Sequence, residues 1–134
     1  AGGSRNPASE ETVAAKDHTI HMNGQEVFKF AIQIMGKTAK RALAKANMKP
    51  EELDMLFPHQ ANHRIITTAA KRLKMPMDKV WVNVDKYANT YAAYIPIALC
   101  EAQKAGALKK GDNIILDGFG AGLTWAAIVL KWSK

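Results

Sequence analysis

Two short segments carry side chains that could do chemistry together: residues 58–62, PHQAN, and residues 87–90, YANT. Each follows an apolar run and precedes an amphipathic stretch, so His59 and Asn89 are expected at strand or loop ends beside helix N-termini. α/β folds keep their functional residues at such places. An imidazole and a carboxamide both offer N–H donors. Two neutral donors aimed at one point would stabilise an oxyanion that develops during a reaction.

The composition is that of one globular domain or part of one. The 134 residues are 48% hydrophobic and 23% charged, which is enough to bury a core. Nineteen basic against twelve acidic residues give a net charge of +7, which favours an acidic partner. No apolar run is long enough to span a membrane, and a nucleic-acid interface would rest on the charge alone. The single cysteine, Cys100, excludes an internal disulfide and suits a reducing cytoplasm.

The hydrophobic pattern predicts an α/β fold, with helices on the faces of a mixed sheet. Apolar residues recur at helical spacing in three segments, about 24–47, 62–74 and 90–105. Apolar runs typical of strands lie at 53–57, 80–84, 113–117 and 123–132. A Gly-rich link makes the last two strands antiparallel neighbours. Residues 1–22 are expected to be irregular, apart from one helical turn after Ser9.

Three details of the helices follow from local chemistry. Asn23 and Glu26 form a plausible capping pair for the first long helix. Thr90 is a suitable N-cap for the third helix. Pro96 is then expected inside that helix, where it would remove one backbone hydrogen bond.

Several motifs in order resemble the C-terminal half of the β-ketoacyl-ACP synthases III. They are residues 59–62 (HQAN), 89–90 (NT) and 118–125 (GFGAGLTW), and residues 21–28 and 95–99 also fit. The resemblance covers about Gly2 to Trp132. It implies that residues 1–134 are an incomplete, thiolase-like C-terminal domain, and that the N-terminal half with the nucleophilic cysteine is absent.

The resemblance also implies a function. Enzymes of this family are acyltransferases of fatty acid biosynthesis, which condense acyl-CoA with malonyl-ACP to 3-oxoacyl-ACP by a decarboxylative Claisen reaction. They need no cofactor beyond these substrates. His59 and Asn89 would be two members of a Cys-His-Asn triad and would hold the malonyl thioester carbonyl as carbon dioxide leaves. Without the resemblance, a structural histidine bonded to a carbonyl would be the commoner interpretation of His59.

The implied partners are acyl carrier protein, coenzyme A thioesters, the N-terminal half and, in a homo-oligomer, a second copy. Cys100 does not replace the nucleophile, because it is expected in the body of the third helix, away from the N-terminus that would lower a thiol pKa. We predict that Cys100 is a buried, inert thiol. The isolated chain is therefore expected to be inactive or only weakly decarboxylating.

Residues 118–122, GFGAG, also match a nucleotide-binding loop, but the strand expected after them argues for a tight turn. The resemblance places this turn in the active site, with the Ala121 N–H in an oxyanion hole and Phe119 beside the acyl channel. A core role for Phe119 is an equal alternative. Ala121 stands where the family usually has glycine, so its donor requires a negative φ or backbone strain.

Basic residues and histidines on the second helix have two interpretations each. Arg64, Lys71 and Arg72 are either an ordinary solvated face or, by resemblance, part of the surface that binds acyl carrier protein. His59 and His63 are four residues apart, which could seat a metal ion on one helix face. The intervening pattern is not that of a zinc protease and no third ligand is evident, so we assign no metal.

The chain departs from the family at residues 88–94, where ANTYAAY replaces the usual GNTSAAS. Two tyrosines in place of serines would overpack an ordinary core. We therefore hypothesise that Tyr91 and Tyr94 cover apolar surface that the N-terminal half would bury, or that they form a self-association face. The alternative function is a redesigned or truncated half-domain that self-associates as a structural module without catalysis.

Overall fold

The structure, a computed structural model, describes residues 1–134. Five α-helices and three strands are joined by short 3-10 turns at Pro50–Glu52, Met77–Lys79 and Tyr91–Ala93. In chain order the main elements are α1 (Glu10–Ala14), α2 (Gly24–Lys45), β1 (Met55–Pro58), α3 (His63–Leu73), α4 (Val84–Tyr87), α5 (Tyr94–Lys104), β2 (Asn113–Gly120) and β3 (Thr124–Lys131). No helix has both the length and the apolar character needed to cross a membrane.

The three strands form one mixed sheet in the order β1-β2-β3. β1 runs parallel to β2, with Leu56 opposite Ile115, and β2 runs antiparallel to β3, with Phe119 opposite Trp125. A single bridge from Leu56 to Val80 adds a short extended segment to the outer edge of β1. The predicted mixed sheet and its antiparallel last pair are confirmed.

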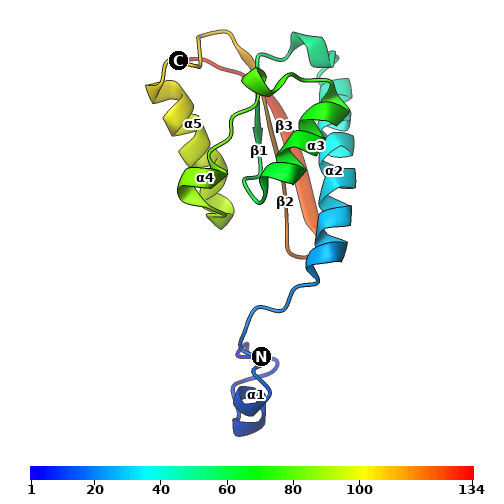
Figure 1. Ribbon diagram of the computed structural model, residues 1–134, viewed down its shortest axis with the longest axis vertical. Helices are drawn as coiled ribbons and strands as arrows, with labels where there is room; N and C mark the ends of the chain where they lie inside the picture. The colour runs from blue at the N-terminus through cyan, green and yellow to red at the C-terminus, as the bar shows by residue number, and fades with distance from the viewer.

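Helices cover both faces of the sheet (Figure 1). Because side chains alternate along a strand, Leu56 and Ile115 point to one face and Phe57 and Ile114 to the other. The first pair packs in one core cluster with the apolar sides of α2 and α3. The second pair packs against Ala98 and Ala102 of α5. The end of β1 is thus enclosed between two helical layers.

The first two predicted helices are confirmed as α2 and α3, and side-chain caps fix where they begin. Asn23 Oδ1 accepts the Glu26 N–H at 3.3 Å at the start of α2. Asn62 Oδ1 accepts the Arg64 N–H at 2.8 Å at the start of α3. Each cap satisfies a backbone donor that the first helical turn leaves free.

Residues 1–22 lie away from the sheet and its helices, and they contain only α1 (Figure 1). Ser9 caps α1: its hydroxyl accepts the Thr12 N–H, and the Thr12 hydroxyl accepts the Ser9 N–H. No residue of α1 is buried. The prediction of one helical turn in an otherwise irregular segment is confirmed.

The start of the third predicted helix was wrong. α5 begins at Tyr94, and Thr90 instead precedes a 3-10 turn with its buried hydroxyl lacking any hydrogen bond. Pro96 therefore lies in the first turn of α5, where its missing N–H would have no helical partner in any case. Val84, predicted to end an extended run, begins α4.

The prediction that Cys100 is buried was also wrong. α5 packs on the sheet through Ala98 and Ala102, which lie on one side of the helix. Cys100 lies between them in sequence and so on the opposite side, where its side chain is exposed.

The segment between α4 and α5 holds a strained backbone. Ala88 has φ 55° and ψ −157°, a conformation that is essentially restricted to glycine. Tyr91 is also left-handed, with φ 53°. These are the residues around Asn89, so backbone strain is concentrated at one of the two segments singled out above.

Replacing Ala88 with glycine should therefore stabilise the chain. We expect Ala88→Gly to raise the free energy of unfolding by about 1 kcal/mol, because it removes the steric strain at positive φ. Ala93→Gly is the matched control: Ala93 has φ −82°, so glycine there should lower the free energy of unfolding by about 0.5–1 kcal/mol. Urea unfolding of the three proteins measures both effects. Equal destabilisation by the two substitutions would contradict the strain.

Candidate active site

His59 lies immediately beyond the last residue of β1 and continues its ladder. The His59 N–H donates to the Asp117 carbonyl at 2.8 Å, and the side chain is only 6% exposed. The backbone of the imidazole-bearing residue is thus fixed by the sheet itself. The prediction that His59 stands at a strand end is confirmed.

Two aromatic rings enclose the imidazole. The Phe119 ring meets it edge to face, with centroids 4.8 Å apart. The Tyr94 ring lies still closer, at 4.1 Å with a tilt of 46°. Phe119 also packs against Phe30 of α2, with ring centroids 6.2 Å apart, so it belongs to the packing on that side of the sheet.

Burial keeps the imidazole neutral. Desolvation lowers the pKa of His59 from 6.5 to about 4, because no neighbouring charge compensates the cation. Neither ring nitrogen has a hydrogen-bond partner, and Nδ1 is completely buried. A neutral imidazole with uncommitted nitrogens is what an oxyanion donor requires.

Asn89 lies in the strained segment and is exposed. Its carboxamide oxygen accepts the Tyr91 N–H at 3.2 Å, which leaves the NH₂ group without a partner. No hydrogen bond joins Asn89 to His59. That the two groups converge on one substrate atom therefore stays a prediction.

Gln60, the residue after His59, is the main polar anchor of this region and is 1% exposed. Its Nε2 donates to the Pro58 and Trp81 carbonyls, each at 3.0 Å. Its Oε1 accepts the Asn83 N–H at 3.0 Å. One buried amide thereby ties the end of β1 to the segment before α4.

Glu101 extends this hydrogen-bond network to α5. Its carboxylate accepts the Trp81 indole N–H at 3.1 Å, the Asn83 amide at 3.0 Å and the Lys86 ammonium at 2.9 Å. The hydrogen bond from Lys86 holds the pKa of Glu101 below its ordinary value. α5, and with it Tyr94, is thus linked through polar contacts to the segment that Gln60 holds.

Sequence reasoning missed Asp117. It is fully buried on β2, opposite Pro58, and neither carboxyl oxygen has a hydrogen-bond partner. Desolvation raises the pKa of Asp117 from 3.8 to about 8. An acidic residue that ends an apolar strand was the available signal, but only the register with β1 shows that it lies beside the His59 backbone.

The Gly-rich segment comprises the last three residues of β2 and the start of the tight turn into β3, and a strand rather than a helix follows it, as predicted. Ala121 is exposed, and its φ is not in the left-handed region. Its backbone N–H is therefore compatible with the predicted donor role. Phe119 contacts both His59 and α2, so its two proposed roles remain open.

The three basic residues predicted on the second helix are exposed on α3. Arg72 packs against α2. Its Nη1 donates to the Gln33 carbonyl at 3.5 Å, and its methylene groups cover Gly36. Arg64 and Lys71 form no ion pair. This face can attract an acidic molecule, and Arg72 also contributes to helix packing.

The histidine pair is not arranged as a metal site on one helix. α3 begins at His63, so His59 lies outside it. No group of three histidine, cysteine, aspartate or glutamate side chains is placed to hold a metal ion.

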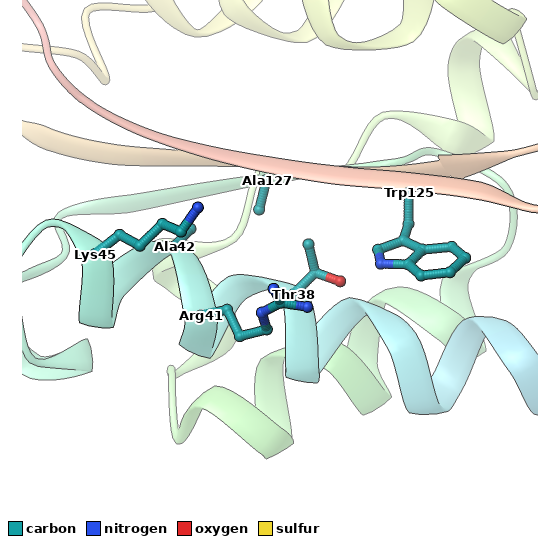
Figure 2. A pocket seen from close by; sticks show the side chains of 6 residues that line it. All are labelled: Thr38, Arg41, Ala42, Lys45, Trp125 and Ala127. Atoms are coloured by element: carbon teal, nitrogen blue, oxygen red, sulfur yellow. The ribbon is translucent and has the colours of Figure 1, made fainter.

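A shallow depression of about 240 Å³ lies elsewhere, between α2 and β3 (Figure 2). It is lined by Thr38, Arg41, Ala42, Lys45, Trp125 and Ala127. None of the predicted site residues contributes to it.

Comparison with known proteins decides the family. Residues 43–132 match the model of the 3-oxoacyl-[acyl-carrier-protein] synthase III C terminal. The chain belongs to this family.

Curated and solved relatives agree with this assignment. The chain is 58% identical over 134 residues to a β-ketoacyl-[acyl-carrier-protein] synthase III of Caldanaerobacter subterraneus subsp. tengcongensis, covering all of this chain and 40% of the relative. The crystal structure of the synthase III from Thermus thermophilus matches 84% of this chain and 35% of its own, at 52% identity and a TM-score of 0.83. A second 3-oxoacyl-(acyl-carrier-protein) synthase III structure matches 98% of this chain and 42% of its own, with a TM-score of 0.90 and 31% identity. The fold is thiolase-like, and the chain spans about 40% of the length of its curated relatives.

The buried Gln60 amide should be essential for stability. Gln60→Glu keeps the shape but removes the two donors to Pro58 and Trp81 and introduces an acid into a buried position. We expect the free energy of unfolding to fall by about 2–3 kcal/mol or more. The matched control is Gln33→Glu on the exposed side of α2, which should change it by less than about 0.5 kcal/mol. Equal effects in urea unfolding would show that the Gln60 hydrogen bonds are not what holds this region.

The two buried titrating groups should leave stability nearly independent of pH between about 4 and 6.5, where their contributions oppose each other, and should let it fall between 6.5 and 8. Between pH 4 and 8 the folded chain keeps a proton on Asp117 that the unfolded chain releases, so the free energy of unfolding falls as the pH rises. His59 acts oppositely: the unfolded chain binds its proton more tightly, so the free energy of unfolding falls as the pH drops from 6.5 toward 4.

Between pH 6.5 and 8 only the Asp117 contribution changes, so this window isolates it. Urea unfolding should show a slope approaching about 1.4 kcal/mol per pH unit in this window. Asp117→Asn should flatten the slope. Asp78→Asn, at an exposed carboxyl, should leave the slope unchanged. A slope that survives Asp117→Asn would mean that another group produces it, and a parent without a slope would mean that Asp117 is already ionised in the folded chain.

Proposed function

We propose that this chain is the C-terminal part of an acyltransferase that condenses acyl-CoA with malonyl-ACP to 3-oxoacyl-ACP in fatty acid biosynthesis. The single observation that carries the proposal is the state of His59. The imidazole is neutral, buried at a strand end, and has no hydrogen-bond partner on either nitrogen. Membership of the synthase III family supports the choice of reaction.

In this reaction the imidazole and the Asn89 amide donate hydrogen bonds to the thioester oxygen of the malonyl group. The bond between the α-carbon and the carboxylate breaks, carbon dioxide leaves, and the electron pair becomes an enolate whose charge lies on that oxygen. The enolate carbon then attacks the carbonyl carbon of the acyl thioester: a carbon–carbon bond forms, the carbon–sulfur bond breaks, and the thiolate that carried the acyl group leaves. Low polarity around His59 strengthens a hydrogen bond to the enolate, because little solvent competes for the charge.

The nucleophile that carries the acyl group has no counterpart in this chain. Cys100 lies in the body of α5 and is exposed on the side away from the sheet. We propose that the N-terminal half of the enzyme supplies this cysteine, so that the isolated chain is inactive or only weakly decarboxylating. An exposed, unpaired thiol fits a reducing cytoplasm.

The proposed oxyanion hole for the acyl intermediate uses the Ala121 N–H, with Phe119 beside the acyl channel. The proposed surface for acyl carrier protein is the exposed side of α3, at Arg64, Lys71 and Arg72. A net charge of +7 favours the encounter with an acidic carrier. No cofactor or metal takes part in this scheme.

A second candidate is a self-associating structural module without catalysis. It is supported by large apolar side chains at the surface, among them Tyr91 at 70% exposure and Ile128 at 57%. Exposed apolar surface of this kind favours association with another protein surface. Light scattering of the isolated chain, together with an activity assay, distinguishes a module from an inactive half-enzyme.

Reconstitution from two halves tests the proposed reaction. The chain is mixed with the separately produced N-terminal half of the Caldanaerobacter relative, and complex formation is followed by size exclusion. We expect the complex, but neither half alone, to form 3-oxoacyl-ACP from acyl-CoA and malonyl-ACP. His59→Ala should lower the rate by about 10²–10³, the usual effect of losing one oxyanion donor.

His63→Ala is the matched control, because His63 is an exposed histidine only four residues away. It should leave the rate of the complex within about twofold of the parent, since exposed positions tolerate substitution. A folded complex that does not condense the substrates, or one that tolerates His59→Ala, would overturn the proposed function.

A further inference from the structure

Tyr94 holds an unusual position for a large side chain. It is the first residue of α5, half-buried, with its ring centroid 4.1 Å from that of His59. No other ring lies as close to the imidazole. One side of His59 is therefore occupied by a side chain from an element 35 positions later in the chain.

The backbone of β2 is shaped to receive this tyrosine. The Tyr94 hydroxyl lies directly over Gly118, and a methyl group added to that glycine would overlap it. Gly118 is in a regular strand and has no positive φ that would itself demand glycine. Its missing side chain thus provides the space in which the end of the phenol ring lies.

The contact relies on packing rather than on hydrogen bonds. The Tyr94 hydroxyl forms none, although burial and the nearby Asp117 carboxylate both raise the pKa of the phenol. The Phe119 ring on His59 differs, because it also packs against Phe30. One of the two rings around the imidazole is thus held by a second aromatic contact, and the other can turn away without breaking a hydrogen bond.

The backbone before Tyr94 is strained. Ala88 and Tyr91 are strained at positive φ, and Thr90 has a buried hydroxyl without a partner. A shift of this segment that relieved the strain would move the start of α5, where Tyr94 lies.

We propose that Tyr94 is a gate on His59: its ring closes one side of the imidazole and must swing out before a substrate group can reach that side. The size of the side chain at position 94 then determines which groups can contact His59. The gate controls access to His59 whatever the substrate, whereas its consequence for thioester substrates rests on the function proposed above.

Chemical modification of His59 tests the gate without any activity assay. Diethyl pyrocarbonate acylates accessible neutral imidazoles, and tandem mass spectrometry locates the product. His63→Gln serves as the background, so that His59 is the only histidine in its tryptic peptide. In this background Tyr94→Ser should raise the modification rate of His59 about tenfold or more, because reactivity follows the fraction of molecules with an open ring.

The matched control is Tyr91→Ser, the same substitution at a tyrosine that is 70% exposed and three positions earlier. It should leave the modification rate of His59 within about twofold, since that side chain does not cover the ring. NMR titration gives an independent measure: Tyr94→Ser should raise the pKa of His59 from about 4 toward 6.5, and Tyr91→Ser should not.

A second pair of variants covers the case in which Tyr94→Ser fails to fold. Gly118→Ala keeps the tyrosine but fills the space under its hydroxyl, so it should also open His59 to the reagent. Gly120→Ala is its control on the same strand, because a methyl group there makes only an ordinary contact with Thr124.

The gate is overturned if Tyr94→Ser or Gly118→Ala leaves His59 as unreactive as the parent, or if either control opens it equally. An opened His59 in a reconstituted complex that still cannot condense its substrates would overturn the proposed function and leave the gate standing. The two ideas can therefore fail separately.

Discussion

The arrangement around His59 depends on the buried amide of Gln60. β1 has only four residues, and α5 lacks a side-chain cap, so neither element fixes the region alone. Gln60 uses two donors and one acceptor on three backbone groups, which satisfies polar atoms that would otherwise be costly to bury. Through Asn83 and Glu101 the same set of bonds reaches α5. The neighbour of the imidazole thus holds in place the helix that carries the ring packed on it.

Desolvation acts on two groups in this region and leaves both neutral. It lowers the pKa of an imidazole and raises that of a carboxyl, because burial always disfavours the charged form. The His59 N–H donates to the carbonyl of Asp117, so the two residues are adjacent across the sheet. The site therefore offers hydrogen-bond donors at neutral pH without a fixed charge, which suits a reaction in which charge appears only transiently.

Sequence periodicity was sufficient for α2, α3 and the sheet, because their apolar faces pack in regular layers and local caps begin the helices. It failed between residues 80 and 94. There Thr90 forms no side-chain cap, so α5 begins only at Tyr94, and the backbone of Ala88 adopts a conformation that its residue type disfavours. Asp117 and Tyr94 were not recognised as neighbours of His59 because nothing local marks a contact across the sheet or across 35 residues. The exposure of Cys100 follows from which side of α5 meets the sheet, which periodicity alone did not resolve.

The decarboxylative reaction proposed for His59 makes two demands that conflict at a buried imidazole. The donor must be dry enough to remain neutral and to bind a developing charge strongly, yet a substrate bearing a carboxylate must reach it. Phe119 and the sheet meet the first demand, because they are held in place and exclude water from the imidazole. If every group around the imidazole were immobile, the substrate could not reach it, so at least one enclosing group has to move. Tyr94 is the one ring at His59 that has no second aromatic contact and that follows strained backbone, and the glycine beneath its hydroxyl shows how closely the closed position is fitted.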